Sequence, residues 1–285
     1  MSDNPQYGPS RLFELRGLRV LRLVGRDALA FAHAQFMNDV IALADGQWQW
    51  NGWLDPKGRV QALFALIRVD PETVWLVTAT DVDAFADSLR RFVFRSKVKI
   101  DLAPIHALGR LDRPVTASGN TSGRLDDAIE LDLSGDAGAR TLVLVPSPAD
   151  AATPEEESAW WQLDIAHGWP SLPGIALDHW TPQQLSLQRL DAFSVKKGCY
   201  PGQEIVARTH FLGRAKRGLA RLRIADAEAH AGDALTDVDG RDVGQLVVVR
   251  NGEALAVVPL EPADAELRLH GQIVERLPLA DGLQR

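Results

Sequence analysis

One segment of the sequence is dense in residues that could do chemistry, and it contains the single cysteine of the chain, Cys199. Lys196 and Lys197 precede the cysteine, and the glycines and proline around it predict a tight, exposed turn. The residues that follow, 203–208, predict a short helix. Neighbouring lysines and a nearby helix N-terminus stabilise a thiolate. The pattern therefore predicts that Cys199 is an accessible, reactive thiol.

Two other roles for this cysteine remain open from the residues alone. A free cysteine is most often a small buried hydrophobic residue. A cysteine can also be the nucleophile of an enzyme when a histidine acts as its base, and His179 and His210 are the candidates for that base. Only the arrangement in space decides among these roles.

A single cysteine limits the metal and redox sites that the chain could hold. It excludes an intramolecular disulfide and a thiolate zinc site, and an iron–sulfur cluster usually needs about four cysteine ligands. Several histidines show no metal-ligand spacing with one another: His33, His106, His167, His230 and His270. We therefore expect no stably bound metal or cluster.

The elements that must position the cysteine begin with an alternation of strand and helix patterns. Asp27 and Asp81 each stand before a run of apolar residues at helical spacing, so each predicts the start of a helix. A Pro and Gly turn at 53–59 precedes an apolar run. Strands are predicted at 18–24, 60–69, 73–78 and 97–102. This order is typical of a split βαβ, ferredoxin-like unit.

The remainder of the sequence predicts a second α+β region and then a barrel. Residues 117–127 are polar and predict a loop, and strands are predicted at 128–133 and 141–145. Helices are predicted at 154–166 and 181–193, the second with Thr181 as its cap. Short alternating runs separated by Gly and Asp turns follow at 219–224, 243–249, 254–258, 266–269 and 273–277. They favour a small antiparallel barrel.

The charge is distributed unevenly. The chain of 285 residues has 31 Lys and Arg against 38 Asp and Glu, a net charge of −7, which excludes a globally basic nucleic-acid wrapper. Two stretches, 90–99 and 189–223, are nevertheless strongly basic. They could face a polyanion such as tRNA together, or they could be two solvated faces.

Composition indicates an ordinary globular protein, with 46% hydrophobic and 24% charged residues. Its longest apolar run, 60–67, is far shorter than the roughly 18 residues of a membrane span. The first 17 residues lack the apolar segment of a secretory signal. We therefore expect a cytoplasmic protein with no membrane partner, and a monomer is favoured.

The cysteine segment carries a family resemblance. The run Lys197-Gly198-Cys199-Tyr200-Pro201-Gly202-Gln203-Glu204 resembles the K-G-C-Y-x-G-Q-E signature of the YgfZ proteins. These are folate-binding relatives of the glycine-cleavage aminomethyltransferase, implicated in iron–sulfur enzyme maintenance and tRNA modification. Further similarity is found at 25–28, 35–40, 55–59, 95–98, 168–170, 182–183 and 208–213, so the resemblance covers most of the chain.

The resemblance implies an α+β fold of two ferredoxin-like, aminomethyltransferase-type domains and a small C-terminal antiparallel β-barrel, arranged around a central folate hole. The implied domains are 1–105, 106–216, which carries the motif, and 217–285. The implied functional residues are Cys199 and Lys197. Gly198, Tyr200, Gly202, Gln203, Glu204 and Arg208 support them.

The resemblance also implies a tetrahydrofolate cofactor or a derivative of it. Trp160 occupies a position where the family places a tryptophan against folate, and Leu18 occupies a second such position with an aliphatic side chain. At helical spacing Trp160 could equally be a core residue. The aminomethyltransferases place a carboxylate shortly after the hairpin glycine, but this chain has Gln61 and Ala62 there, and neither can act as a general base.

We therefore expect a folate-binding accessory protein for iron–sulfur cluster assembly or repair in client enzymes, affecting tRNA modification indirectly, rather than a classical aminomethyltransferase. Its expected partners are folate and, transiently, iron–sulfur client or assembly proteins, with tRNA as a further candidate. The alternatives are a module that binds tRNA or another polyanion, and a folate-dependent one-carbon (aminomethyl) transferase.

Overall fold

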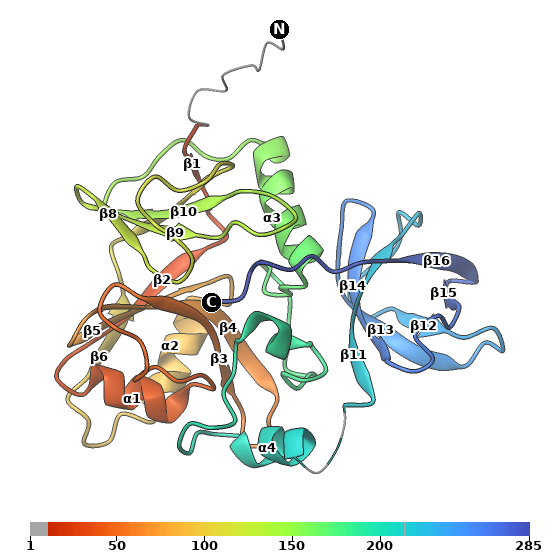
Figure 1. Ribbon diagram of the computed structural model, residues 1–285, viewed down its shortest axis with the longest axis horizontal. Helices are drawn as coiled ribbons and strands as arrows, with labels where there is room; N and C mark the ends of the chain where they lie inside the picture. Colours follow the sequence, from red (N-terminus) through yellow and green to blue (C-terminus); the bar gives the residue numbers. More distant parts are fainter. Residues whose placement is uncertain (1–10, 212, 214) are drawn as a thin grey trace, which may run out of the picture.

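The computed structural model describes residues 11–211, 213 and 215–285, so the first ten residues of the segment compared with a secretory signal lie outside the described residues. It contains two five-stranded sheets and a closed six-stranded barrel. The two sheets pack together on one side of the molecule, and the barrel lies on the other side, beyond α3 (Pro154–His167) and α4 (Gln203–Phe211) (Figure 1). The expected α+β fold class with a C-terminal barrel is confirmed.

One sheet has the expected ferredoxin-like order. Its neighbours, all antiparallel, run β3-β4-β5-β2-β6. The strands are β2 (Arg19–Val24), β3 (Trp48–Leu54), β4 (Val60–Asp70), β5 (Thr73–Thr78) and β6 (Lys99–Leu102). Without β3, which extends the sheet beyond β4, this is the strand order of a split βαβ unit.

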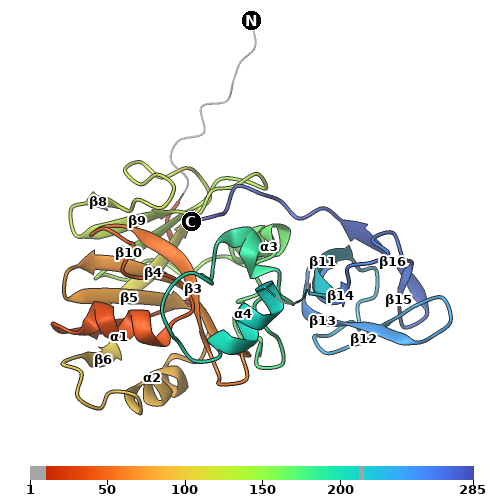
Figure 2. The same cartoon turned by 60° about the horizontal axis from the view of Figure 1, so that its bottom comes forward.

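Two helices cover one face of this sheet, α1 (Ala28–Gln35) and α2 (Val82–Arg90) (Figure 2). Asp81 caps α2 as expected, since its side chain accepts hydrogen bonds from the backbone N–H groups of Asp83 and Ala84. Asp27 does not cap α1. Its Oδ2 atom instead accepts from the backbone N–H of Lys97, which fastens the segment before β6 to the start of α1.

Strand β4 is buried on both faces, which explains its continuous apolar sequence. Leu63 and Ile67 belong to a core shared with the second sheet, whereas Phe64 and Leu66 belong to the core beneath α1 and α2. Alternate residues of a strand point to opposite faces. The sheet is therefore a middle layer, with helices on one side and the second sheet on the other (Figure 2).

The second sheet has the order β1-β7-β10-β9-β8. Its strands are β1 (Phe13–Glu14), β7 (His106–Arg110), β8 (Gly123–Leu125), β9 (Ala128–Asp132) and β10 (Thr141–Val145). The expectation of a simple loop over 117–127 was wrong, because β8 forms within it and pairs with β9. Helix α3 (Pro154–His167) begins with a capping box of Thr153 and Glu156 and was predicted.

The helix expected over 181–193 was wrong. The segment forms turns and one short 3-10 helix, η1 (Leu187–Leu190). Ser186 and Asp191, on either side of η1, adopt left-handed backbone conformations with φ of 51° and 53°, which an α-helix cannot include. Leu185, Leu187 and Leu190 are all buried, and the backbone of the segment makes turn-type hydrogen bonds in place of a regular helical ladder.

The C-terminal strands form a closed antiparallel barrel in the order β11-β14-β13-β12-β15-β16. They are β11 (Arg217–Arg223), β12 (Ala234–Thr236), β13 (Asp242–Arg250), β14 (Glu253–Pro259), β15 (Leu267–Leu269) and β16 (Gln272–Leu277). The sequence indicated all of them except β12. After β16 the chain returns to the sheets, where the carbonyl of buried Leu283 accepts from Trp50 Nε1 at 2.8 Å (Figure 1). Among the described residues, no helix has the length and apolar character needed to cross a membrane.

Candidate functional site

The motif loop places its thiol at the surface. Cys199 is exposed, in the turn directly before α4 (Gln203–Phe211). The short helix and the accessibility of the cysteine are as predicted, and the alternative of a buried hydrophobic cysteine is wrong. Within the loop, Gln203 Nε2 donates to the carbonyl of Lys197 at 3.2 Å, which ties the start of α4 back to the residues before the cysteine.

Lys197 is buried, and its ammonium group is engaged with α1. Its Nζ atom donates to the carbonyl of Phe36 at 2.5 Å and to the carbonyl of His33, both at the C-terminal end of that helix. The carbonyl end of a helix carries a partial negative charge, which a cation stabilises. Lys197 is therefore an anchor between the motif loop and α1, not the exposed flanking cation that the sequence suggested.

Burial lowers the pKa of Lys197 to about 8, and Asp39 opposes that shift. The Nζ atom also lies 4.8 Å from the centroid of the Tyr200 ring, a cation–π arrangement that favours the charged amine. Burial, and next the charge of Lys197, lower the pKa of His33. The charged state of Lys197 thus depends on its contacts with α1 and Tyr200, which compensate for its loss of water.

Two glycines bring the motif into backbone contact with the β3–β4 hairpin. A Cβ atom on Gly202 would lie 2.5 Å from the carbonyl oxygen of Asp55 and 2.7 Å from the Cα of Gly58. Both glycines have positive φ, 78° and 74°. The Asp55 carboxylate shapes the hairpin tip by accepting from the backbone N–H groups of Lys57 and Arg59. The tip and the start of α4 therefore form one tightly packed unit.

The remaining motif residues lie at the surface or support the loop. Gly198, Glu204 and Arg208 are exposed, whereas Tyr200 is buried in the core that joins the two sheets. No histidine ring nitrogen lies within hydrogen-bond distance of the Cys199 sulfur in the described parts of the chain. His179 instead lies 3.8 Å from Asp178, and His210 packs against Phe211. Among the described residues, no contact pairs Cys199 with either histidine, so that pairing stays a prediction.

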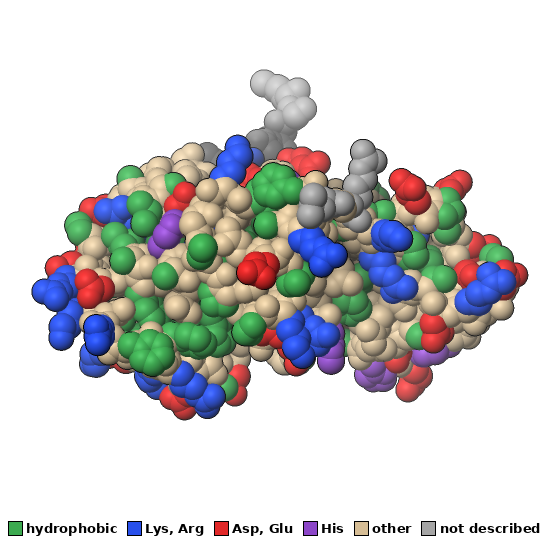
Figure 3. Space-filling view, turned by 90° about the horizontal axis from the view of Figure 1, so that it is seen from below, with side chains coloured by type: hydrophobic (Ala, Val, Ile, Leu, Met, Phe, Trp, Pro, Cys, Tyr) green, Lys and Arg blue, Asp and Glu red, His purple; other side chains and the backbone are tan. Residues whose placement is uncertain are grey.

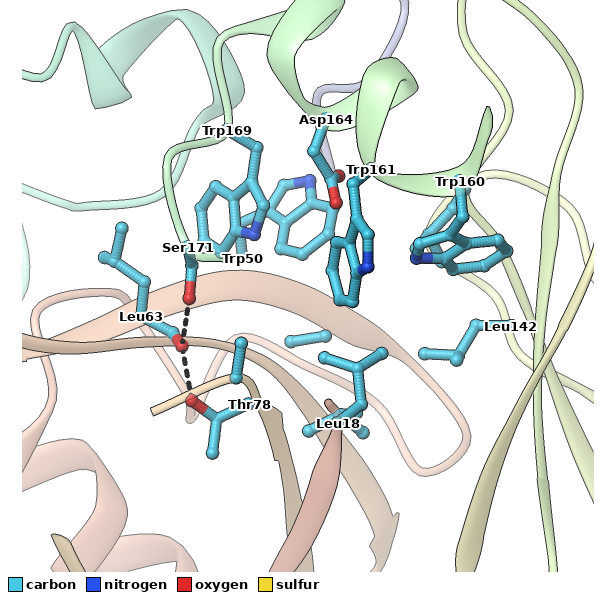
Figure 4. A pocket seen from close by; sticks show the side chains of 14 residues that line it. Leu18, Trp50, Leu63, Thr78, Leu142, Trp160, Trp161, Asp164, Trp169 and Ser171 are labelled. Carbon is cyan, nitrogen blue, oxygen red and sulfur yellow. Dashed lines mark hydrogen bonds between the residues drawn. The ribbon is translucent and has the colours of Figure 1, made fainter. Parts of the chain in front are cut away.

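A separate cavity lies where the two sheets and α3 meet, and four tryptophans form its walls (Figure 4). Trp160 and Leu18, the two residues placed near folate by the resemblance, both line it. Trp160 is also almost fully buried, so it is a core residue and a cavity residue at once. The other tryptophans and polar groups of the lining are Trp50, Trp161, Trp169, Thr78, Asp164 and Ser171.

A buried ion pair borders the cavity. The Arg140 side chain is fully buried, and its Nη2 atom lies 2.5 Å from Asp164 Oδ1. Arg140 also donates to the carbonyl of Trp160 and lies 4.9 Å from the centroid of that indole ring. Burial raises the pKa of Asp164, and the Arg140 guanidinium opposes that shift. Asp164 thus provides a carboxylate at the cavity wall (Figure 4), and Arg140 holds that carboxylate in place.

The open space of this cavity is about 30 Å³, enough for one or two water molecules. None of the motif residues lines it, so the structure does not bring Cys199 to its wall. Sequence reasoning missed Arg140 and Asp164 because nothing in their local sequence indicates that they pair. For the tryptophan walls of the cavity a sequence signal did exist, because all eight tryptophans fall in the first 180 residues.

The positions after the hairpin glycine offer no catalytic carboxylate. Ala62 is buried beneath α1 and α2, and Gln61 Nε2 contacts the carbonyl of Arg59 at 3.4 Å. Across residues 11–211, 213 and 215–285, no group of three or more His, Cys, Asp or Glu side chains is arranged to hold a metal ion.

Comparison with known proteins finds relatives that match most of this chain. No family model matches the chain. A tRNA-modifying protein YgfZ from Vibrio vulnificus is 28% identical over 90% of this chain and 87% of its own, and one from Aliivibrio fischeri is 26% identical over 93% and 91%. The chain is similar to the YgfZ proteins over most of its length.

The chain has the fold of an aminomethyltransferase. The glycine cleavage system aminomethyltransferase T from Bartonella henselae superposes with a TM-score of 0.72 over 95% of this chain and 85% of its own, at 15% sequence identity. At that identity the likeness concerns the fold. An uncharacterized Haemophilus influenzae protein is 28% identical over 79% of this chain and 78% of its own.

Proposed function

We propose that this protein is a folate-binding accessory protein for iron–sulfur cluster assembly or repair, and that it affects tRNA modification through the enzymes it serves. The observation that carries the proposal is the tryptophan-walled cavity, because it joins Trp160 and Leu18 from distant parts of the chain. We further propose that Cys199, exposed in the anchored motif loop, is the functional thiol.

The lining has the chemistry that a reduced folate requires. A pterin is a flat ring with N–H donors on one edge, so it needs apolar or aromatic walls and a fixed acceptor. Trp50, Trp161 and Trp169 are such walls, and the Asp164 carboxylate is such an acceptor (Figure 4). A pterin is larger than the present open space, so binding requires indole side chains to rotate outward. Bound tetrahydrofolate would supply one-carbon chemistry.

The residues at the β3–β4 hairpin argue against classical aminomethyl transfer. General base catalysis needs a titratable group within reach of the proton it removes. Gln61 and Ala62 supply none after the hairpin glycine, and Oδ1 of Asp55, which lies before that glycine, accepts from two backbone N–H groups of the turn. An accessory role, with the lone thiol acting transiently on a client or on a reactive one-carbon species, fits this set of residues better.

Titration with tetrahydrofolate tests the cavity. We expect binding that quenches tryptophan fluorescence, and we expect Trp160→Leu to weaken binding about tenfold, because a leucine cannot stack on a pterin. Trp75, which does not line the cavity, provides the control variant Trp75→Leu with near-unchanged affinity. Thermal unfolding of each variant separates lost binding from lost structure. Absence of tetrahydrofolate binding by the intact wild-type protein would refute the folate site.

Replacement of the thiol tests the second part of the proposal. We expect cells that carry Cys199→Ala at normal protein level to lose iron–sulfur enzyme activity, whereas purified Cys199→Ala binds tetrahydrofolate normally because Cys199 does not line the cavity. The alkylation rate of Cys199 with and without tetrahydrofolate reports whether ligand binding reaches the loop. Unchanged iron–sulfur enzyme activity in these cells would remove the thiol from the proposal and leave the folate site intact.

A further inference from the structure

A protruding segment after α2 exposes aromatic rings to solvent. Phe94 is 86% exposed and Phe92 is 40% exposed. Arg91, Arg95 and Lys97 alternate with these rings and are exposed as well. An isolated exposed apolar residue is unremarkable on a protein surface. Two rings set among three cations, with no acidic residue from 91 to 97, form a different kind of surface.

The cations of this segment are also unpaired. In the described parts of the chain, the side chains of Arg91, Arg95 and Lys97 make no ion pair, and neither do those of Lys57 and Arg59 at the hairpin tip. Three barrel arginines contrast with them, since they pair with carboxylates: Arg221 with Glu253, Arg223 with Glu275, and Arg268 with Glu266. These five cations outnumber the two carboxylates that contact the same segments, Asp27 and Asp55, so on a chain of net charge −7 they make a local positive region.

Ring packing and backbone contacts connect the two cationic elements. Phe92 packs edge-on against Trp53, with ring centroids 5.9 Å apart, and Trp53 is the residue before the last of β3. The hairpin tip that follows contacts Gly202 at the start of α4. The view from below the molecule shows lysine and arginine side chains near hydrophobic ones, with some acidic side chains among them (Figure 3). We name residues 57–59 and 91–97 the basic-aromatic face.

We propose that the basic-aromatic face binds single-stranded RNA. Exposed aromatic rings stack on unpaired bases, and unpaired arginines and lysines contact the phosphates between them, which is the combination used by proteins that bind single strands. Duplex RNA hides its bases and offers only phosphates and hydroxyls. The bases of a tRNA loop are accessible, so a loop fits this face better than a stem does. The inference is independent of folate binding.

An acidic protein is the competing partner for such a face. The positive charge of the basic-aromatic face would attract either an acidic protein or RNA. Stacking on a base needs a ring as exposed as that of Phe94, whereas binding of an acidic peptide does not. Glu204 and Asp55 lie on the neighbouring α4 and hairpin tip, and Oδ1 of Asp55 accepts from two backbone N–H groups of that tip. The dependence of binding on the phenyl ring therefore distinguishes the two partners.

The test is the binding of a fluorescein-labelled, unmodified tRNA transcript, measured by anisotropy across a range of KCl concentrations. We expect Arg91→Glu with Arg95→Glu to weaken binding at least tenfold and to reduce the slope of log affinity against log salt by about 1.4, the loss of two phosphate contacts. Phe94→Leu keeps an apolar side chain but removes the ring, and we expect it to weaken binding about fivefold or more.

The matched control is the double reversal Arg223→Glu with Arg241→Glu on the barrel, where both arginines are exposed and paired with carboxylates. We expect it to leave RNA affinity unchanged, and we expect every variant to bind tetrahydrofolate like the wild type. Equal loss of affinity in the control pair would overturn the proposal, as would failure of the wild type to bind RNA at low salt. Binding of polyglutamate as tightly as tRNA, insensitive to Phe94→Leu, would indicate an acidic protein partner instead.

Discussion

Arg140→Met is expected to destabilise the fold by about 3–5 kcal/mol, because it removes one partner of a buried ion pair and leaves the other. Arg140 is fully buried and its guanidinium contacts Asp164, the carbonyl of Trp160 and the carbonyl of Leu133. Methionine fills much of the same volume but supplies no donor. Asp164 would then have to bind a proton or remain as a buried charge with no partner.

The pH dependence of this variant should show which of these happens. Burial already raises the pKa of Asp164 in the native protein, and loss of Arg140 removes the opposing effect. Folded Asp164 would then keep its proton at pH values where the unfolded chain releases it. Stability of Arg140→Met should therefore fall as the pH rises above about 4, the ordinary pKa of an aspartate. Urea unfolding at several pH values measures this.

The double variant Arg140→Met with Asp164→Leu is the control for that prediction. It replaces the ion pair by apolar side chains, and we expect it to recover most of the lost stability, since a well-packed apolar pair can equal a buried ion pair. Tetrahydrofolate binding should not recover, because the acceptor at the cavity wall is gone. A double variant as unstable as Arg140→Met would show that packing around Arg140, rather than the unpaired charge, sets the stability.

The sequence predicted the regular elements wherever local pattern and burial agree. Strand β4 was predictable because both of its faces are covered, which makes its sequence a continuous apolar run. The start of α2 was predictable because the cap, Asp81, acts on neighbouring backbone N–H groups. The segment 181–193 has the same kind of apolar spacing. It did not form a helix, because the left-handed residues Ser186 and Asp191 interrupt it and burial stabilises the turns.

Some features of the candidate site were predictable from local sequence and others were not. Exposure of Cys199 follows from the glycines and proline beside it, so it was predictable. Burial of Lys197 was not, because the carbonyls that hold its ammonium belong to α1, more than 160 residues earlier in the chain. The ion pair of Arg140 and Asp164 was also missed, since neither partner carries a local signal. A local sequence pattern cannot predict contacts between residues that only folding brings together.

Gly202→Ala is expected to disrupt the motif loop more than any other small change within it. Gly202 has φ of 78°, a conformation that costs an alanine about 1–2 kcal/mol. Its Cβ atom would also lie 2.5 Å from the Asp55 carbonyl oxygen, and this backbone atom cannot move aside without shifting the hairpin tip. Overpacking of this kind typically adds about 1–3 kcal/mol. We expect a total loss of stability of about 3 kcal/mol, measured by urea unfolding.

The neighbouring glycine of the same motif is the matched control. Nothing lies within 4 Å of a Cβ atom on Gly198, and its φ is not positive, so Gly198→Ala should leave stability within about 0.5 kcal/mol of the wild type. Alkylation of Cys199 supplies a second readout. In Gly202→Ala the start of α4 must separate from the hairpin tip, so the alkylation rate should change, whereas Gly198→Ala should react like the wild type. Equal effects of the two substitutions would show that contact with the hairpin does not hold the thiol in place.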